Sequence, residues 1–180
     1  DTQLVSLAAF NPASCRWVPM PEVCDERIHK EMKKFPEGKD SFHGQCPTHI
    51  TNPVDSGTRV KNETASCLPA LWLDADHQHP EQTKNYPPEE IAMDVVMNDI
   101  MIKPTCVIHT GGGLHARYQL ADPPMIWDVD KQKQAENLAN IQHLLARWKH
   151  HVTAAFAARG YEVDPVFDLA RVLRVPDTLN

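Results

Sequence analysis

The stretch from Lys131 to Arg159 constrains the fold most, because its apolar residues recur at the spacing of one helix face. The recurring residues are Leu138, Ile141, Leu145, Trp148, Val152 and Phe156. Gly160 follows this stretch, as is typical of a helix C-cap. A helix with one long apolar face needs a surface to cover, so we expect it to pack across one face of a β-sheet.

Short apolar stretches ahead of this helix predict the strands of that sheet. Leu68 to Asp76 is apolar and ends in acid, which predicts a buried strand with an exposed carboxyl end. Thr105 to His109 and Leu114 to Leu120 predict two more strands, joined as a hairpin by the glycines at 111–113. Strands, or a strand and a turn of helix, are also expected at Tyr161 to Val163 and Arg171 to Val175.

A shorter helix is predicted between the first two of these strands. Pro80 to Pro88 predicts a loop, and Pro87-Pro88-Glu89-Glu90 suits a first helical turn, because proline is tolerated there and acids oppose the positive end of the helix dipole. Pro104 ends the pattern. The chain therefore belongs to the α/β or α+β class, with a mixed β-sheet flanked by helices.

The N-terminal part shows weaker signals. Residues 1–66 contain many prolines and predict an irregular portion with short strands and one helix from about Pro21 to Lys34. We interpret all 180 residues as one domain whose residues 67–180 form the core. The first residue is not Met, so we expect the chain to be a fragment of a longer protein.

Composition excludes several classes of protein. Hydrophobic residues make up 42% of the chain, and no apolar stretch approaches the roughly 20 residues that a membrane helix needs, so no membrane partner is expected. A net charge of -6 argues against a protein that binds nucleic acid mainly through a large positively charged surface. Five cysteines without a Cys-x-x-Cys pair favour reduced thiols in a cytoplasmic protein.

Asp74 and Asp76 close the first predicted strand. Residues i and i+2 of a strand point the same way, so the two carboxylates should lie side by side. Two like charges are costly there unless a cation or a proton lies between them. The pair predicts a divalent-cation site, and capping of the next turn is the structural alternative.

The predicted hairpin carries groups that suit a phosphate. Gly112 and Gly113 expose backbone N–H groups to a ligand that approaches closely, and His115 and Arg117 should point to one side of the returning strand. The alternative is a flexible hairpin tip. His109, at the other end of the turn, is expected to be structural.

A third segment, residues 164–176, adds acids and arginines. Asp164 and Asp168 are the acids, and Arg171 and Arg174 are the arginines. The alternative is structural, with Asp168 paired with Arg171 or capping a helical turn, and with the arginines solvated.

A structural zinc site is a weaker hypothesis for the N-terminal portion. His43, Cys46 and His49 have a His-x-x-Cys-x-x-His spacing that Cys24 or Cys15 would complete. The cysteines lack the paired spacing that is typical of zinc knuckles, so a site without zinc is the alternative. The two histidines after the acid pair, His77 and His79, either reach the cation site or face water.

Taken together and in this order, these motifs resemble those of the archaeo-eukaryotic primase superfamily, within it the primase-polymerase domains of plasmid and phage replication proteins. That family has an Asp-x-Asp at a strand end, a small residue followed at two by histidine, and an apolar residue followed by aspartate ahead of an Arg-x-Pro element. The matching residues are Asp74 and Asp76, Gly113 and His115, Asp164 or Asp168, and Arg174 to Pro176. Spacing to the last element favours Asp164. Asp177 departs from the pattern, because glycine is usual there.

The resemblance implies an RRM-like catalytic core and a nucleotidyltransferase. Such an enzyme makes or extends primers in DNA replication, by two-metal transfer from NTPs or dNTPs with Mg2+ or Mn2+. The implied metal ligands are Asp74, Asp76 and Asp164, and the implied nucleotide-binding residues are Gly112, Gly113, His115, Arg117, Arg171 and Arg174.

The implied partners are a single-stranded DNA template and a fused or associated helicase or accessory helical domain. The resemblance also implies a cytoplasmic protein of a bacterium or archaeon, encoded by a plasmid or phage. Two rival functions stay open. One is a metal-dependent phosphodiesterase or nuclease. The other is a catalytically silent origin-binding module, against which the three retained acids argue, because buried carboxylates without a metal cost stability.

Overall fold

The computed structural model describes residues 3–9, 14–19, 26, 30, 41–49, 60–80, 83–164 and 166–174, with backbone alone for 3–9, 14–19, 41–43 and 174. The chain forms two compact units, each built from separate segments. Unit 1 comprises Asp1–Pro69, Pro123–Ala139 and Asp168–Asn180, and unit 2 comprises Ala70–Asp122 and Asn140–Phe167. The interpretation of all 180 residues as one domain stays a prediction.

Unit 1 contains an antiparallel sheet drawn from both ends of the chain. Its strands are β1 (Gln3–Ala9), β2 (Ser14–Pro19), β3 (Ser41–Gly44), β4 (Thr48–His49) and β8 (Val172–Arg174). Their order is β2-β1-β3-β8, and β4 also pairs with β1. The N-terminal portion is therefore less irregular than predicted, because its short strands pair with each other and with a strand near the C-terminus. The helix predicted over about 21–34 lies outside the described residues apart from Glu26 and Lys30.

Unit 2 contains a three-stranded sheet in the order β5-β7-β6. The strands are β5 (Ala70–Asp76), β6 (Cys106–His109) and β7 (Gly113–Gln119), close to the predicted ranges. Both pairs are antiparallel, so β5 and β6 run the same way with β7 inserted between them, a split βαβ arrangement. The α+β class is confirmed. The expectation of a mixed sheet is wrong in one respect: the hairpin separates the two parallel strands, and every described strand pair is antiparallel.

Both helices predicted within residues 67–180 begin where expected, and the longer one also ends there, whereas the shorter one ends at Asp99, ahead of the predicted stop at Pro104. α2 (Glu89–Asp94) follows Pro88 with two acids in its first turn and continues into a π-helical turn, η3 (Val95–Asp99). α3 spans Lys131–Ala158. Asp130 caps its start by accepting backbone N–H bonds from Gln132 and Lys133, and Gly160 beyond its end has a φ of 83°.

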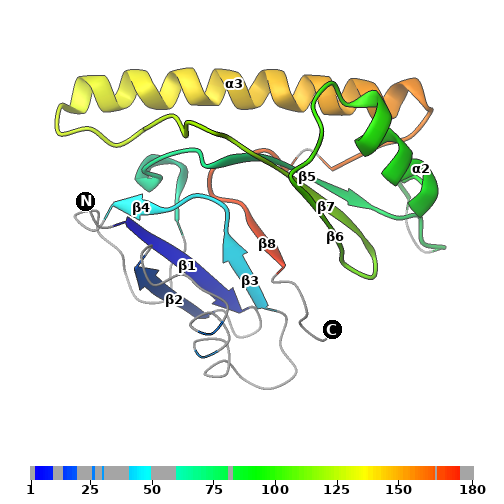
Figure 1. Ribbon diagram of the computed structural model, residues 1–180, viewed down its shortest axis with the longest axis horizontal. Helices are drawn as coiled ribbons and strands as arrows, with labels where there is room; N and C mark the ends of the chain where they lie inside the picture. The colour runs from blue at the N-terminus through cyan, green and yellow to red at the C-terminus, as the bar shows by residue number, and fades with distance from the viewer. Residues whose placement is uncertain are drawn as a thin grey trace. The chain divides into compact units, whose positions relative to one another are not determined.

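Apolar packing in unit 2 fixes which sheet face the helices cover. The apolar stripe of α3 is buried from Ile141 to Phe156, and Trp148 within it donates a 2.8 Å hydrogen bond from Nε1 to the Trp72 carbonyl. The Trp148 ring meets Tyr118 of β7 edge-on, with 4.8 Å between centroids. Tyr118 lies opposite Leu71, so α3 covers the face that carries Leu71, Leu73 and Ala75 (Figure 1).

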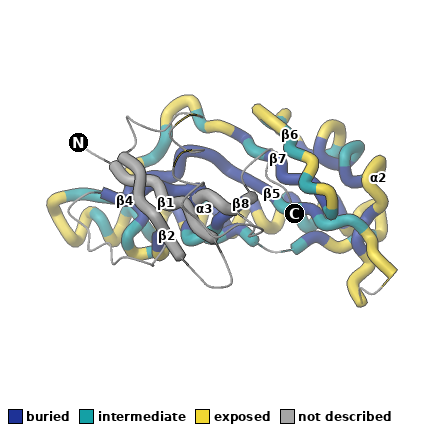
Figure 2. Tube along the Cα trace, turned by 90° about the horizontal axis from the view of Figure 1, so that it is seen from below, coloured by how far each residue is buried: buried dark blue, intermediate teal, exposed yellow. Residues whose placement is uncertain are grey.

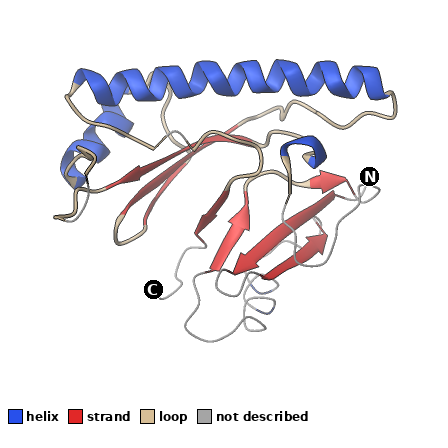
Figure 3. Ribbon diagram, turned by 180° about the vertical axis from the view of Figure 1, so that it is seen from behind, coloured by secondary structure: helices blue, strands red, loops and turns tan. Residues whose placement is uncertain are grey.

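A second set of contacts ties the shorter helix to the same layer. Arg159, just after α3, bonds Asp94 of α2 at 2.9 Å and Asp99 of η3 at 2.7 Å. Figure 3 shows α2 lying under the C-terminal part of α3. Asp74 and Asp76 lie on the face of the sheet opposite to the one that α3 covers.

Burial differs across the three strands. β5 and β7 are mostly buried, whereas β6 is an edge strand whose residues are exposed or half-buried (Figure 2). Among the described helices, none combines the length and the apolar character that crossing a membrane requires.

Candidate functional site

The register of β5 and β7 brings the first two motifs together. Asp74 lies directly opposite His115, and Asp76 lies opposite Gly113. Residues directly opposite in an antiparallel pair share a face, so these four residues lie together on the face turned away from α3. His115 is only 7% exposed, and its Nε2 lies 3.3 Å from Asp74 Oδ1. Its other ring nitrogen, Nδ1, is buried and has no hydrogen-bond partner among the described residues.

Gly113 is required by close packing of the two strands. A Cβ at this position would lie 2.4 Å from the Ala75 carbonyl oxygen and 2.9 Å from Asp76 Cα, both of which are backbone atoms. The absence of a side chain therefore lets β7 approach β5 at the acid pair. At Gly112, by contrast, an added Cβ would meet nothing within 4 Å.

The rest of the glycine turn is fastened to the end of β5. His77 N–H donates a 2.8 Å bond to the Gly112 carbonyl, and Thr110 N–H donates a 2.9 Å bond to the Gly113 carbonyl. Gly111 has a φ of 84°, a conformation that favours glycine. The turn is thus a bonded hairpin, and its predicted contact with phosphate stays a prediction.

Asp164 lies in the same unit as the acid pair. The indole of Trp72, two residues before Asp74 and so on the same face, donates a 2.9 Å bond to the Val166 carbonyl and holds this segment beside the sheet. Asp164 Oδ1 accepts a 2.7 Å bond from the Tyr86 hydroxyl and lies 2.5 Å from Lys84 Nζ. Pairing with Asp164 raises the pKa of Lys84.

The charges of the three acids act on one another. Burial raises the pKa of Asp76 above its ordinary value, and repulsion from Asp74 and Asp164 raises it further, against a smaller lowering by His115 and His77. A carboxylate in this position favours a nearby cation. Carboxylate oxygens are the ligands that Mg2+ and Mn2+ prefer, so the donor chemistry fits these ions. Even so, within the described part of the chain no three His, Cys, Asp or Glu side chains stand close enough together to ligate one ion.

The alternative third acid belongs to the other unit. Asp168 lies in unit 1 and accepts a 3.0 Å bond from Arg171 Nη2, the pairing that the structural alternative predicts. The backbone of Arg174 forms part of β8 opposite Phe42, and its side chain lies outside the described atoms. Of the sequence-predicted residues, unit 2 thus holds Asp74, Asp76, Asp164, the glycines, His115 and Arg117, and unit 1 holds Asp168, Arg171 and Arg174.

Arg117 occupies the position expected from the alternation of β7. It lies opposite Trp72 on β5 and Cys106 on β6, two residues from His115, and is half-buried. It therefore shares the sheet face of the acid pair.

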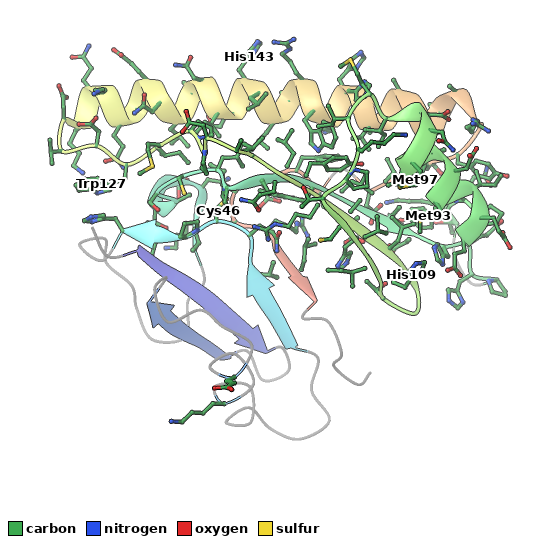
Figure 4. The ribbon with its side chains drawn as sticks, viewed as in Figure 1. Cys46, Met93, Met97, His109, Trp127 and His143 are labelled. Carbon is green, nitrogen blue, oxygen red and sulfur yellow. The ribbon has the colours of Figure 1, made fainter. Side chains whose placement is uncertain are left out.

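Three further histidines of unit 2, His109, His143 and His151, have different surroundings. His109, at the end of β6, lies 2.9 Å from Glu89 at the start of α2, and the structural role predicted for it stays a prediction (Figure 4). His143 is exposed on the outer side of α3. His151 accepts a hydrogen bond from Met101 N–H, a contact that the sequence did not predict.

The zinc hypothesis stays a prediction. Cys46 is buried, and the His49 ring stacks on Trp127 with 3.8 Å between centroids and 12° between planes (Figure 4). Cys24 and the side chains of His43 and Cys15 lie outside the described atoms. The described part of this segment shows a stacked ring pair in place of a ligand set.

Sequence reasoning missed Lys84 and Tyr86. Both lie in a segment that the prolines around it mark only as a loop. Their partner is 80 positions away from Lys84, so no local pattern reveals the contact.

Comparisons with known proteins give one solved structure with a similar fold. No protein-family model matches the chain, and no curated protein matches it. Among solved structures, it is similar to the AEP domain of the primase-polymerase (PrimPol) of cyanophage S-2L, with a TM-score of 0.49 and 12% identity over 96% of this chain and 72% of that chain. At this identity the match compares folds and says nothing of residue roles.

Proposed function

We propose that unit 2 carries out template-directed nucleotidyl transfer from nucleoside triphosphates, the reaction that makes or extends a primer in DNA replication. The register that sets Asp74 and Asp76 against His115 and Gly113, with the charge of Asp164 acting on the same face, carries this proposal. This arrangement places carboxylates that suit divalent cations beside a buried histidine and an arginine that suit a phosphate.

Asp74, Asp76 and Asp164 are the residues that would hold Mg2+ or Mn2+. When bound, two such ions activate the attacking 3'-hydroxyl and neutralise the leaving pyrophosphate. The raised pKa of Asp76 supports this assignment, because divalent charge would relieve the repulsion among the three carboxylates.

His115 and Arg117 are proposed to bind the triphosphate. The buried Nδ1 of His115 is a polar atom that a phosphate oxygen would satisfy, and the contact of Nε2 with Asp74 keeps the ring in place. A guanidinium two residues along the same face suits bidentate phosphate contact. Catalysis then depends on positioning and charge neutralisation, without a covalent protein intermediate. Arg171 and Arg174 of unit 1 are proposed to contact phosphate or template.

The direct test is a synthesis assay with the purified chain. Labelled NTPs or dNTPs and a single-stranded DNA template, with Mn2+ or Mg2+, should give extended product that chelation with EDTA abolishes. A phosphodiesterase would instead shorten the template in the absence of any triphosphate. Degradation without synthesis would replace the proposed function with that rival.

The identity of the third acid is tested by a matched pair of variants four positions apart. Asp164→Asn should lower the rate of synthesis by roughly 100-fold or more, because it removes a charge from the metal site. Asp168→Asn should keep most activity, because its carboxylate pairs with Arg171 in unit 1. Initial rates at saturating Mn2+ measure both, and the reverse ranking would make Asp168 the third ligand.

A further inference from the structure

Lys84 and Tyr86 both donate hydrogen bonds to the same oxygen of Asp164. Asp164 Oδ1 lies 2.5 Å from the Lys84 ammonium and accepts a 2.7 Å hydrogen bond from the Tyr86 hydroxyl. One donor is a cation and the other is neutral. A divalent ion that binds Asp164 competes with the ammonium because both are cations, whereas it does not compete in this way with the neutral hydroxyl.

The segment that carries Lys84 and Tyr86 is hydrogen-bonded to the loop segment that carries Asp164. Asn85, between them, donates its backbone N–H to Glu162 Oε2 at 2.9 Å and its side-chain amide to the Gly160 carbonyl at 2.7 Å. Glu162 N–H returns a 2.9 Å bond to the Asn85 carbonyl. The backbone at Lys84 and Tyr86 is therefore held beside the segment that carries Asp164, even when the Lys84 side chain turns away.

The two side chains differ in freedom. Tyr86 is only 5% exposed, so its hydroxyl is held in one place. The Lys84 side chain is 49% exposed and can turn into solvent without leaving a cavity. An ion pair this exposed is weak, whereas a divalent ion gains from several carboxylates at once.

We propose that Lys84 is a tethered counterion that competes with the divalent cation for Asp164, and that Tyr86 is a positioning residue that keeps this carboxylate aimed at the site when the lysine leaves. The inference rests on the metal site of the proposed function. It assigns opposite effects on metal affinity to two side chains two positions apart.

The test measures Mn2+ binding to the whole chain by isothermal titration calorimetry, without nucleotide or DNA. Lys84→Met and Lys84→Gln should each bind Mn2+ about two- to fivefold more tightly than wild type, because the competing charge is gone. Tyr86→Phe should bind roughly tenfold more weakly, as is typical when a partner of a metal ligand is lost. Melting temperatures in EDTA show that each variant is folded.

Lys133→Met is the matched control. Lys133 also pairs with an aspartate, Asp128, at 3.1 Å on the surface, so the variant makes the same charge change in unit 1 and should leave Mn2+ affinity unaltered. Equal or weaker Mn2+ binding by both Lys84 variants would overturn the counterion role while leaving the metal site intact. Absence of Mn2+ binding by wild type would overturn the metal site and this inference with it.

Discussion

Asp74→Asn and Asp76→Asn are each expected to lower nucleotide incorporation by roughly 1,000-fold or more, because each removes one negative charge from the proposed metal site. Single-turnover extension of a primed template in Mn2+ measures the loss. Asp122→Asn is the control, since Asp122 is an exposed acid of the same unit just beyond β7. Synthesis that persists unchanged in both variants would contradict the metal assignment.

The melting temperature of Asp76→Asn distinguishes a loss of synthesis at the site from a loss caused by misfolding. The raised pKa of Asp76 means that its ionised form is disfavoured in the folded chain, so the metal-free protein carries a penalty at neutral pH. Asp76→Asn should therefore melt no lower in EDTA than wild type. Any advantage should shrink as pH falls through the raised pKa of Asp76, because the native acid then becomes neutral. A clear drop in melting temperature would point to misfolding as the cause of lost synthesis.

Gly113→Ala, which adds a single methyl group, is expected to lower the stability of unit 2 strongly. Its Cβ would overlap the backbone of Ala75 and Asp76, which the β5–β7 ladder holds in place, so the strands must separate at the acid pair. We expect a loss of about 3 kcal/mol in the free energy of unfolding and a melting temperature about 6–12 °C lower. Synthesis should also fall, because His115 shifts away from Asp74.

Gly112→Ala provides the matched control for this substitution. Position 112 has open space around an added Cβ, so the variant should melt within about 1–2 °C of wild type. Thermal melts and extension assays on both proteins make the comparison. Equal stability of the two variants would contradict the close approach of β7 to β5.

The core of unit 2 was predictable because its signals are local. An apolar run that ends in acid marks β5, glycines flanked by apolar runs mark the hairpin, and a stripe at helical spacing marks α3. The same patterns place Asp74 and Asp76 on one strand and His115 on another. The sequence does not show that β7 lies between β5 and β6, since strand order depends on long-range pairing.

Other features could not be read from local patterns. The strands β1 to β3 lie among turn-forming residues, and β3 pairs with β8 far along the chain. Asp164 and Asp168 fit one short motif equally well, and only the fold places them in different units. Lys84 and Tyr86 become recognisable only through their bonds to Asp164.

Crystals of the chain grown with Mn2+ and a non-hydrolysable nucleoside triphosphate test the central claim most directly, through anomalous diffraction at the manganese edge. We expect manganese peaks bonded to the carboxylates of Asp74, Asp76 and Asp164, with the triphosphate against His115. A bound triphosphate with no manganese at these three carboxylates would contradict it.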